Sequence, residues 1–508
     1  MGRKELSDMS NLKNNYRKYI AAAAAICLAM SSAGCSKSDS SSETDTKATS
    51  AQISSEAFEI SAEDKDVGYD ETEAVKIALS GESAEIEGSG AACENGMLSI
   101  TKGGTYILSG DLSGEIYVKA KDSDVKLVLN GVSVTNSDYA ALMIDKASKV
   151  TLTLEDGTEN SFADGAEYTL ADSDDNTDGC IFSRANLTIN GSGSLSVTGS
   201  YKHGIVSKDN IVIAGGNITV NAASGGIYGK DSVKISGGTI DVTAGSNGIR
   251  ATNDEDAEKG FVSVTGGDIT VNAAGDALEA ETVIQIEDGT LTLTSGGGAA
   301  NASMKSDGQP NGDWGSWSKD DMGTPPDMNG QQTGNPPEMP SNNSDSALTA
   351  TAYTAVSADS STDNSDSTST DTSSADSEST SAKGIKAGSE LNILGGVISI
   401  DSSDDSLHSN GTMNISAGDI TASSGDDGTH ADGDLTISGG KITVSKSYEG
   451  LEGLNIYISG GEIDVTASDD GLNAAGGSDT GSGERAGRDM FAGSDEDHIL
   501  EISGGTLK

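Results

Sequence analysis

The sequence has few of the side chains from which compact globular cores are built. Only 4% of its 508 residues are aromatic and 34% are hydrophobic, whereas 66 are glycine. Several ordinary hydrophobic cores need more large apolar side chains than this. The composition therefore favours either an elongated fold with a narrow core of Ile, Val and Leu or extensive disorder.

Cysteine and proline are also scarce, and both absences restrict the fold. Cys27 and Cys35 lie in the N-terminal segment, which leaves Cys93 and Cys180 far apart in the sequence. Two such thiols do not form a disulfide framework. All six prolines lie within residues 310–340. Proline is excluded from strands in which every backbone N–H is hydrogen-bonded, so the rest of the chain is compatible with a continuous β architecture.

Basic residues are outnumbered by acidic ones, 31 to 80, which gives a net charge of −49. This charge repels nucleic acid phosphates and anionic lipid headgroups at long range. We therefore expect no nucleic acid partner. Acidic side chains offer oxygen ligands to hard cations, so calcium is a candidate cofactor.

The N-terminal segment has the pattern of an export signal. Basic residues precede the apolar run IAAAAAICLAM (20–30), and small residues follow it up to Cys35. This order is typical of a secretory signal peptide. Ala33-Gly34-Cys35 resembles a bacterial lipobox, with Ser32 in place of the usual leucine, so Cys35 is the predicted lipidation site.

We predict an extracellular, cell-surface lipoprotein of a Gram-positive-type bacterium. Its membrane contact is expected only through the N-terminal lipid anchor. The alternative, an uncleaved signal that serves as the anchor, leads to the same compartment.

A repeat of about 22 residues dominates the chain from residue 185 onward. Its marker is an Ile-x-Ile-x-Gly-Gly phrase, and the second Ile or Val of this phrase falls at ten positions: Ile189, Ile213, Ile235, Val264, Ile286, Ile393, Ile415, Ile437, Ile458 and Ile502. A period near 22 that is neither helical nor leucine-rich indicates an all-β solenoid. Each coil would pair with the next at about 4.8 Å, with inward Ile on inward Ile. Glycine pairs suit the corners because glycine accepts positive φ.

We expect five segments along the chain. They are a signal peptide with a lipobox-like end (1–35), a linker with a short helix (36–92), the first part of the solenoid (93–297), a low-complexity insertion (298–382) and the second part of the solenoid (383–508). The helix is expected over ETEAVKIALSG (71–81). The insertion contains every proline and a Ser/Thr/Asp tract, so we expect disorder there. The last coil stops just past a glycine corner, so a truncated solenoid is expected.

One corner recurs in four successive coils. It reads SSDDSLHSNG (402–411), SGDDGTHADG (424–433), KSYEGLEGLN (446–455) and ASDDGLNAAG (467–476). Residues at the same phase of a solenoid stack in columns, and three columns are expected here. The first column is Asp405, Asp427, Glu449 and Asp470; the second is Asp404, Asp426, Tyr448 and Asp469; the third is His408, His430, Glu452 and Asn473. Asp276 lies on the first column before the insertion, and Lys383 lies between Asp276 and Asp405.

Stacked carboxylates need a compensating cation. At a spacing of about 4.8 Å they repel by roughly 3–4 kcal/mol at an effective dielectric constant of 20. Calcium binds several carboxylate and carbonyl oxygens in flexible geometry, so we assign it to the acidic columns. The predicted ligands are Asp404, Asp405, Asp426, Asp427, Glu449, Asp469 and Asp470. The alternative is ordinary turn chemistry, in which Asp hydrogen-bonds its own backbone in a tight corner.

The third column, together with Tyr448, predicts a linear polar face with a repeat of one coil. Such a face suits a linear polymer such as a polysaccharide. The predicted carbohydrate-binding residues are His408, His430, Tyr448, Glu452 and Asn473. A transition metal on the two histidines is a weaker interpretation, because the pattern supplies no third ligand.

The sequence resembles the clostridial carbohydrate-binding β-helix family. The resemblance rests on the ISGG-x-I-x-V phrase, the series of four corners and the segments TYILSGDLSGEIYV and LVLNGVSVTNSD. It implies a right-handed parallel β-helix, similar in fold to pectate lyases, in exported and often lipid-anchored proteins. It also implies that the protein binds calcium and plant cell-wall polysaccharide, either cellulose or acidic pectin-like chains, without catalysis.

Three functions remain open at this point. The first is non-catalytic polysaccharide binding at the cell surface by a monomer, assisted by calcium. The second is a calcium-dependent pectate-lyase-like enzyme, which needs an Arg or Lys base near the proton to be removed. The basic residues near the columns are Lys383, Lys386, Lys446 and Arg250, and none lies in a lyase-like motif. The third function is a structural surface adhesin.

Overall fold

The computed structural model describes residues 53–169, 176–302, 381–474 and 498–508. These residues belong to one compact unit that begins at residue 51. Within the described ranges the chain forms 35 strands and one four-residue helix, α2 (Ser55–Phe58). The all-β prediction is therefore confirmed. The described residues include no apolar helix of membrane-spanning length, and the predicted signal peptide with Cys35 lies outside them.

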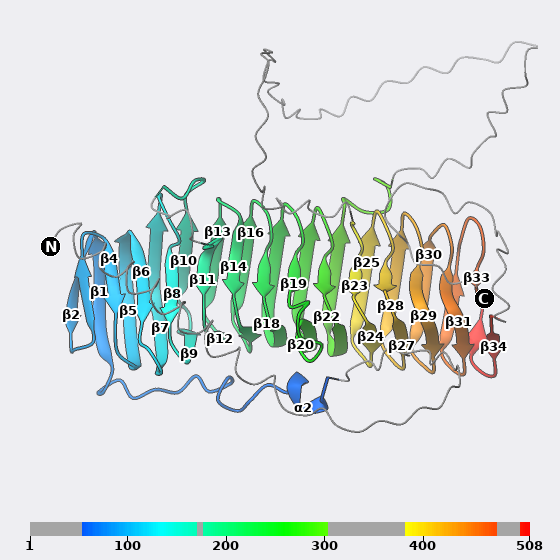
Figure 1. The fold of residues 1–508 in the computed structure, drawn as a ribbon, viewed down its shortest axis with the longest axis horizontal. Helices are drawn as coiled ribbons and strands as arrows, with labels where there is room; N and C mark the ends of the chain where they lie inside the picture. Colours follow the sequence, from blue (N-terminus) through cyan, green and yellow to red (C-terminus); the bar gives the residue numbers. More distant parts are fainter. Residues whose placement is uncertain (1–52, 170–175, 303–380, 475–497) are drawn as a thin grey trace, which may run out of the picture. The chain divides into compact units, whose positions relative to one another are not determined.

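The strands form three parallel ladders that run side by side along the unit (Figure 1). The first ladder contains β4 (Met97–Ile100), β6 (Glu115–Lys119), β8 (Leu142–Lys146), β11 (Gly179–Ser183), β14 (His203–Ser207), β17 (Ile227–Gly229), β19 (Ile249–Ala251), β21 (Leu278–Ala280), β23 (Ile385–Ala387), β26 (Leu407–Ser409), β29 (Thr429–Ile437), β31 (Leu451–Ile458) and β33 (Leu472–Asn473).

The second ladder contains β5 (Gly104–Ser113), β7 (Asp124–Asn136), β9 (Lys149–Leu154), β12 (Asn186–Gly191), β15 (Asn210–Ile213), β18 (Ser232–Ala244), β20 (Phe261–Ala273), β22 (Val283–Ser295), β24 (Glu390–Ile393), β27 (Thr412–Ile415), the ends of β29 and β31, and β34 (Leu500–Ile502). The third contains the second halves of β5, β7, β18, β20 and β22, and β10 (Glu159–Asp164), β13 (Ser194–Gly199), β16 (Asn217–Ala222), β25 (Val397–Ser402), β28 (Asp419–Ser424), β30 (Lys441–Lys446), β32 (Glu462–Val465) and β35 (Thr506–Leu507). β1 (Val75–Gly81) pairs with Tyr106–Leu112 of β5 and so extends from the second ladder into the third. Two further strands, β2 (Ser83–Glu87) and β3 (Ala91–Glu94), pair antiparallel with β1 and β4.

The marker positions of the predicted repeat pair in register. All ten marker positions pair in succession, from Ile189 with Ile213 to Ile458 with Ile502. Ile286 pairs directly with Ile393, so the ladder continues in register across the predicted insertion. The second glycine of the corner pair has a left-handed φ, as at Gly238 (+97°) and Gly396 (+88°), which side chains rarely tolerate.

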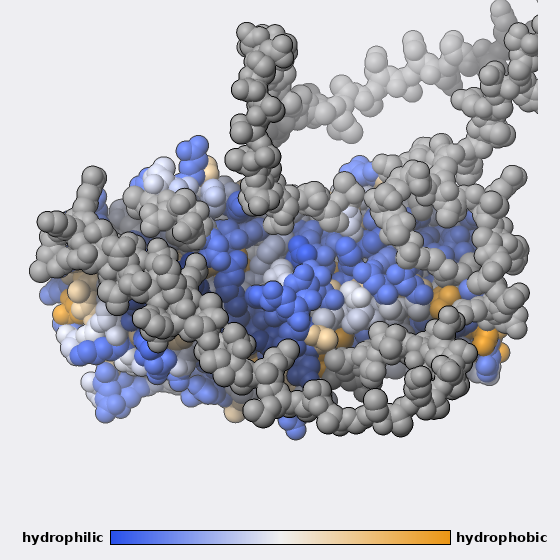
Figure 2. All heavy atoms as spheres, viewed as in Figure 1, coloured by the Kyte–Doolittle hydropathy of each residue, from blue (hydrophilic) through white to orange (hydrophobic). Residues whose placement is uncertain are grey.

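One continuous aliphatic core lies inside the three ladders. Alternate residues of each strand point inward, as in β18 and β20, where buried Ile and Val alternate with exposed Thr, Asp and Asn. Every inward side chain therefore contacts its equivalents in the coils on either side. This narrow core accounts for a low content of large apolar residues. On the face shown in Figure 2, the coloured surface is largely hydrophilic.

The predicted helix over residues 71–81 is wrong. Residues Val75–Gly81 form strand β1, which pairs antiparallel with β2 and parallel with β5. Ile77 and Leu79 are buried, and the apolar residues of this stretch recur at every second position, which is strand periodicity. The ladders therefore begin before residue 93, and α2 is the one helix among the described linker residues 53–92.

Part of the predicted linker is docked on the second ladder. Phe58 packs edge-on against Phe261, with ring centroids 5.1 Å apart. Lys234 Nζ donates a hydrogen bond to the carbonyl oxygen of Glu59 at 2.9 Å, and Lys149 Nζ lies 2.6 Å from Asp64 Oδ1. Residues 53–70 thus form a strap along the ladder, whereas residues 36–52 lie outside the described residues.

We predict that Ile235→Ala lowers the free energy of unfolding by about 2–5 kcal/mol, because a fully buried side chain leaves a cavity between two neighbouring coils. Val397→Ala is the matched control, since Val397 is 54% exposed at an outward position. Denaturant titration followed by circular dichroism measures both. An equal effect of the two substitutions would contradict the inward and outward assignment.

Candidate functional site

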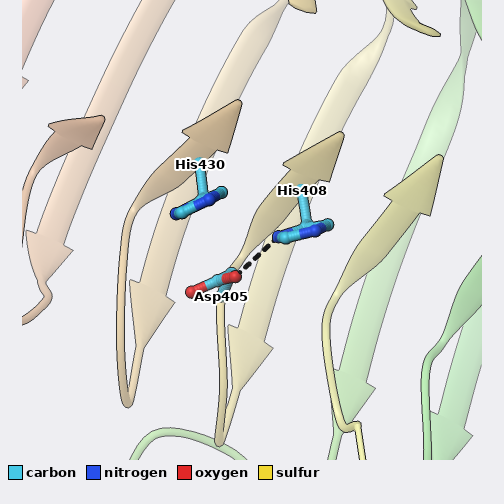
Figure 3. Close-up of side chains that lie close together, drawn as sticks. All are labelled: Asp405, His408 and His430. Atoms are coloured by element: carbon cyan, nitrogen blue, oxygen red, sulfur yellow. Dashed lines mark hydrogen bonds and ion pairs between the residues drawn. The ribbon is translucent and has the colours of Figure 1, made fainter. Parts of the chain in front are cut away.

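The repeated corner places the third column in register on the first ladder. His408 pairs with His430, His430 with Glu452, and Glu452 with Asn473. The two imidazole rings are stacked, with centroids 4.9 Å apart and an interplanar angle of 12° (Figure 3). The geometric prediction for this column is therefore confirmed.

The first column is equally regular. Each of its residues accepts a backbone hydrogen bond from the preceding coil. The N–H of Ser406 donates to the carbonyl of Asp427 at 2.9 Å, that of Gly428 to Glu449 at 2.9 Å, and that of Gly450 to Asp470 at 2.8 Å. The same pattern joins the carbonyl of Lys383 to Ala277, the residue after Asp276. Lys383 therefore lies on the acidic column, as the sequence predicts.

Side chains of the first column also bind the next coil. Asp276 Oδ1 accepts the backbone N–H of Lys383 at 2.7 Å. Asp405 Oδ1 accepts that of Asp427 at 3.0 Å, and Asp427 Oδ1 accepts that of Glu449 at 3.2 Å. The acidic residues thus satisfy donors of the adjacent coil as well as their own turn. This structural role is one that neither the calcium interpretation nor the turn interpretation anticipated.

A lysine supplies the compensating charge at the first acidic corner. Lys383 Nζ lies 2.7 Å from Asp405 Oδ2 and 3.1 Å from Asp404 Oδ2. Asp405 Oδ2 also lies 2.9 Å from His408 Nδ1 (Figure 3). Burial favours the protonated acid, yet Lys383 and His408 lower the pKa of Asp405 well below its usual value. At this corner the chain itself provides a cation.

His430 forms the second polar centre of the site. Its Nδ1 lies 2.8 Å from Glu452 Oε2 and 3.3 Å from Asp427 Oδ2, and its Nε2 lies 3.2 Å from Asp432 Oδ1. Burial opposes the charge on the ring, but Asp427 and Glu452 raise the pKa of His430 to about 12. The two acidic partners therefore favour the protonated form of the ring.

The acidic charge is less fully compensated further along the column. Burial raises the pKa of Asp427, and the charges of Asp405 and Glu452 act in the same direction. Burial also raises the pKa of Glu449. Within the described part of the chain, no lysine or arginine forms an ion pair with either carboxylate. A bound cation would therefore be stabilised most by the carboxylates at this end of the site.

The second column follows the same phase. The backbone N–H of Tyr448 donates to the carbonyl of Asp426 at 2.6 Å, and that of Asp469 donates to the carbonyl of Tyr448 at 2.9 Å. Asp404 and Asp426 come close enough to Asp405 for one ligand oxygen of each to lie within 4.8 Å of the others. This group is all oxygen, which suits calcium.

Two further groups of the site combine carboxylates with imidazole. They are Asp405 with His408 and His430, and Asp427 with His430 and Glu452. Imidazole nitrogen suits transition metals better than calcium. The structure therefore supplies the third ligand that the sequence pattern lacked.

The predicted carbohydrate contacts differ in accessibility. His408 and His430 are only 3% and 4% exposed, and His408 Nε2 lies 2.8 Å from Asn410 Oδ1. Tyr448, Glu452 and Asn473 are half-buried and reach the surface. A polymer on this face would therefore contact these three side chains first, with the histidines holding the acidic groups beneath.

A comparison with protein families fits this architecture. A family model described as carbohydrate-binding domain-containing protein matches residues 94–428, more than half of the chain. The chain belongs to this carbohydrate-binding domain family. The match ends at residue 428, so the first corner (402–411) and the acidic pair of the second, Asp426 and Asp427, lie inside it, whereas His430 and the last two corners lie beyond it.

Two known proteins are similar to part of this chain. A carbohydrate-binding domain-containing protein of Acetivibrio thermocellus is 41% identical over 128 residues, which are 25% of this chain and 45% of the relative. The chain thus matches less than half of that relative's length. A solved structure of a polysaccharide lyase-like protein from C. thermocellum, a gadolinium derivative, is 37% identical, covers 44% of this chain and 92% of its own, and has a TM-score of 0.43.

The sequence alone did not reveal how far the third column extends along the chain. Below His408 the register continues to Lys386, Glu279 and Arg250. Arg250 Nε lies 2.9 Å from Glu279 Oε2. The signal available in the sequence was a four-residue phrase that begins and ends with a small residue. It occurs as GIRA (248–251), ALEA (277–280), GIKA (384–387) and SLHS (406–409). Insertions of differing length between these phrases obscured the repeat interval in the sequence.

We predict that Lys383→Met destabilises the protein by about 3–5 kcal/mol, because it leaves the buried Asp405 carboxylate without its cation. Lys441→Met, which removes an exposed pair with Asp419 at 3.4 Å, is expected to change the free energy of unfolding by less than about 1 kcal/mol. Adding Asp405→Asn to Lys383→Met should recover part of the loss. Thermal and denaturant unfolding measure all three variants.

The pH dependence of this effect has a definite sign. The pKa of Asp405 is lower in the folded chain than its ordinary value of 3.8, so its contribution to stability is present above that pH and is lost on acidification. The difference between wild type and Lys383→Met should therefore narrow below pH 3.8. A difference that stays constant between pH 7 and pH 3 would show that the pair does not control Asp405.

Proposed function

We propose that the chain is a non-catalytic polysaccharide-binding protein and that calcium assists its binding. The observation that carries this proposal is the third column, in which polar side chains repeat once per coil along one face. Coils repeat at about 4.8 Å, so a linear polymer laid along the ladder meets a new set of groups at each coil. Membership of a carbohydrate-binding family supports the same ligand class.

The finer fold that we propose is a right-handed parallel β-helix with about 22 residues per coil. Successive strands of each coil belong to different ladders, and each strand pairs in parallel with its equivalent in the next coil. The hand follows from the general preference of parallel crossover connections. Such a rod offers a long straight face, which suits an extended ligand.

Calcium is proposed for the acidic columns. Asp404, Asp405 and Asp426 fit an oxygen-only cation site, but Lys383 already neutralises part of it. The more favourable end is Glu449 with the exposed acids Asp469 and Asp470, because no lysine or arginine among the described residues pairs with Glu449. Asp427 borders this end and already pairs with His430. When bound there, calcium would neutralise the carboxylates and bridge them to carboxylates of an acidic sugar.

The choice of polysaccharide follows from charge. A protein at −49 repels a polyuronate at long range, so binding to pectin-like chains requires a bridging cation. Cellulose is uncharged and needs no such bridge. We therefore propose that retention on acidic pectin-like chains depends on calcium and that retention on cellulose does not.

We further propose that the protein acts as a monomer on the outside of a Gram-positive-type cell, held by a lipid on Cys35. The support is the order of basic, apolar and small residues in the N-terminal segment. A surface position would expose the ladder to extracellular polysaccharide and to calcium.

The first test is retention of the full chain on insoluble pectate, with calcium and with a chelator. We expect retention only with calcium, and a rise in the thermal midpoint on adding calcium, since a ligand at 100 times its Kd stabilises the folded state by about 2.7 kcal/mol. Asp427→Asn with Glu449→Gln should remove both effects. Asp241→Asn with Asp268→Asn is the matched control, because both residues are exposed on the third ladder.

Two results would contradict this proposal. A thermal midpoint that calcium leaves unchanged would reduce the acidic columns to hydrogen-bonding corners. Absence of retention on both pectate and cellulose, in either condition, would leave the structural adhesin as the better explanation.

A polysaccharide lyase is the second candidate, and one observation favours it. Lys386 lies on the third column next to His408, is half-buried, and holds its Nζ 3.7 Å from both Asp276 Oδ2 and Glu279 Oε1. A lysine in the binding face could act as the base toward a bound uronate once its ammonium group has released a proton. The sequence offered no lyase-like motif around it.

We expect no lyase activity when the protein is incubated with polygalacturonate and calcium and the ultraviolet absorbance of unsaturated product is followed. Steady product formation that Lys386→Met abolishes, with retention on pectate unchanged, would establish the enzyme instead. Lys441→Met provides the control for a general loss of positive charge.

A further inference from the structure

The third column continues beyond Arg250 into a row of aromatic and apolar side chains. Arg250 pairs in register with Tyr228, and Tyr228 with Val206. The register then runs from Val206 to Phe182, and beyond Phe182 to Met143 and Tyr117. One outward column of the first ladder is thus apolar in its first half and charged in its second.

These residues form a cluster outside the main core. Buried Met143, Phe182 and Val206 make its floor, together with Tyr139 and Ala140. Half-buried tyrosines make its outer surface, and we call them the aromatic platform. They are Tyr117, Tyr168, Tyr201 and Tyr228.

The rings of the platform are held in place. Tyr168 and Tyr201 are stacked, with centroids 4.2 Å apart and an interplanar angle of 21°. Tyr228 lies 4.6 Å from the ring of His203. The hydroxyl of Tyr117 donates to Asp145 Oδ2 at 3.0 Å. Rings that are fixed before a ligand arrives lose little conformational freedom when they bind it.

Three of the cations around the platform are paired with carboxylates. Lys119 Nζ lies 3.1 Å from Asp145 Oδ2, and Arg184 lies 3.5 Å from the other oxygen of the same carboxylate. Lys208 Nζ lies 3.5 Å from Asp178 Oδ1. The platform therefore contrasts with the acidic corners, where carboxylates outnumber cations. It offers apolar ring faces rimmed by hydrogen-bonding groups and little net charge.

We propose that the aromatic platform is a second binding subsite, for the uncharged sugar units of a neutral hexose polymer. One face of a pyranose ring carries C–H groups and packs on an aromatic ring, while its hydroxyls reach polar groups at the edge. The inference rests on the proposed polysaccharide-binding function and deepens it. The column is divided into a platform for neutral sugar and a calcium-assisted half for acidic sugar.

Continuity with the candidate site supports this assignment. Two platform residues, Tyr117 and Tyr228, lie on the same outward column of the first ladder as the acidic half, joined through Arg250, Glu279 and Lys386. Tyr168 and Tyr201 come from segments outside the strands and pack beside this column. A neutral chain needs no bridging cation, so binding at the platform is independent of calcium. A uronate chain would gain little from Lys119, Arg184 and Lys208, because each already has an acidic partner; Lys202 Nζ lies 5.7 Å from the centroid of the Tyr201 ring.

The tyrosines differ in how closely they are tied to the fold. Tyr168 bonds to Asp164 Oδ2 at 2.7 Å and to the carbonyl of Gly179 at 3.0 Å, which is a structural role. Tyr117 and Tyr201 lie at the outer surface and are the informative positions. Tyr457 is half-buried on the second ladder and provides a matched control.

The test is calorimetric titration of the full chain with cellohexaose and with oligogalacturonate, each with calcium and with a chelator. Tyr117→Ala with Tyr201→Ala should weaken cellohexaose binding by about tenfold or more, as expected for aromatic anchors. It should leave oligogalacturonate binding with calcium unchanged. Tyr117→Phe with Tyr201→Phe and the control Tyr457→Ala should keep wild-type affinity for both.

A second measurement uses the wild-type chain and does not depend on variants that fold. Tyrosine nitration is mapped by mass spectrometry with and without cellohexaose, and protection is expected at Tyr117 and Tyr201 but not at Tyr457. Absence of that protection, or wild-type cellohexaose affinity in the alanine variant, would overturn the platform while calcium-dependent oligogalacturonate binding still supported the proposed function. A wild type that binds neither sugar would overturn both.

Discussion

The parallel pairing of residues about 22 positions apart determines both the core and the surface of this protein. Each backbone N–H and carbonyl of a strand is bonded to the adjacent coil, so a residue cannot change its lateral neighbours without breaking a whole ladder. Inward positions then place Ile on Ile, and outward positions place each outward side chain beside its equivalent in the next coil. The stacked rings of His408 and His430, 4.9 Å apart, are a direct result.

This constraint places like charges next to one another, and the chain reduces the repulsion between them in three ways. Lys383 occupies the acidic column itself and contacts Asp404 and Asp405. His430 lies between Asp427 and Glu452, which raise the pKa of its ring. Backbone N–H groups of the next coil donate to Asp405 and Asp427. The repulsion that pointed to calcium from the sequence is therefore partly relieved by the protein, and the case for a metal rests on the acids that remain uncompensated.

The sequence allowed the repeat and the columns to be predicted because both follow from spacing alone. Ile286 and Ile393 could be matched across the insertion since their phrases are alike. The helix expected at 71–81 was wrong because a stretch of acidic and aliphatic residues reads as helix until pairing with β5 is known. The role of Lys383 and the apolar row at Phe182 could not be predicted, because they depend on which side chains meet in space after insertions of differing length.

The outward column can change its chemistry from coil to coil, whereas the core cannot. An inward Ile is enclosed by equivalents above and below, so a polar replacement would be buried without a partner. An outward residue needs to suit only its two neighbours and the solvent. Tyr228 beside Arg250, and Arg250 beside Glu279, meet that condition step by step. A single ladder can thus pass from aromatic to charged while its backbone register stays fixed, which gives one rigid face more than one kind of binding surface.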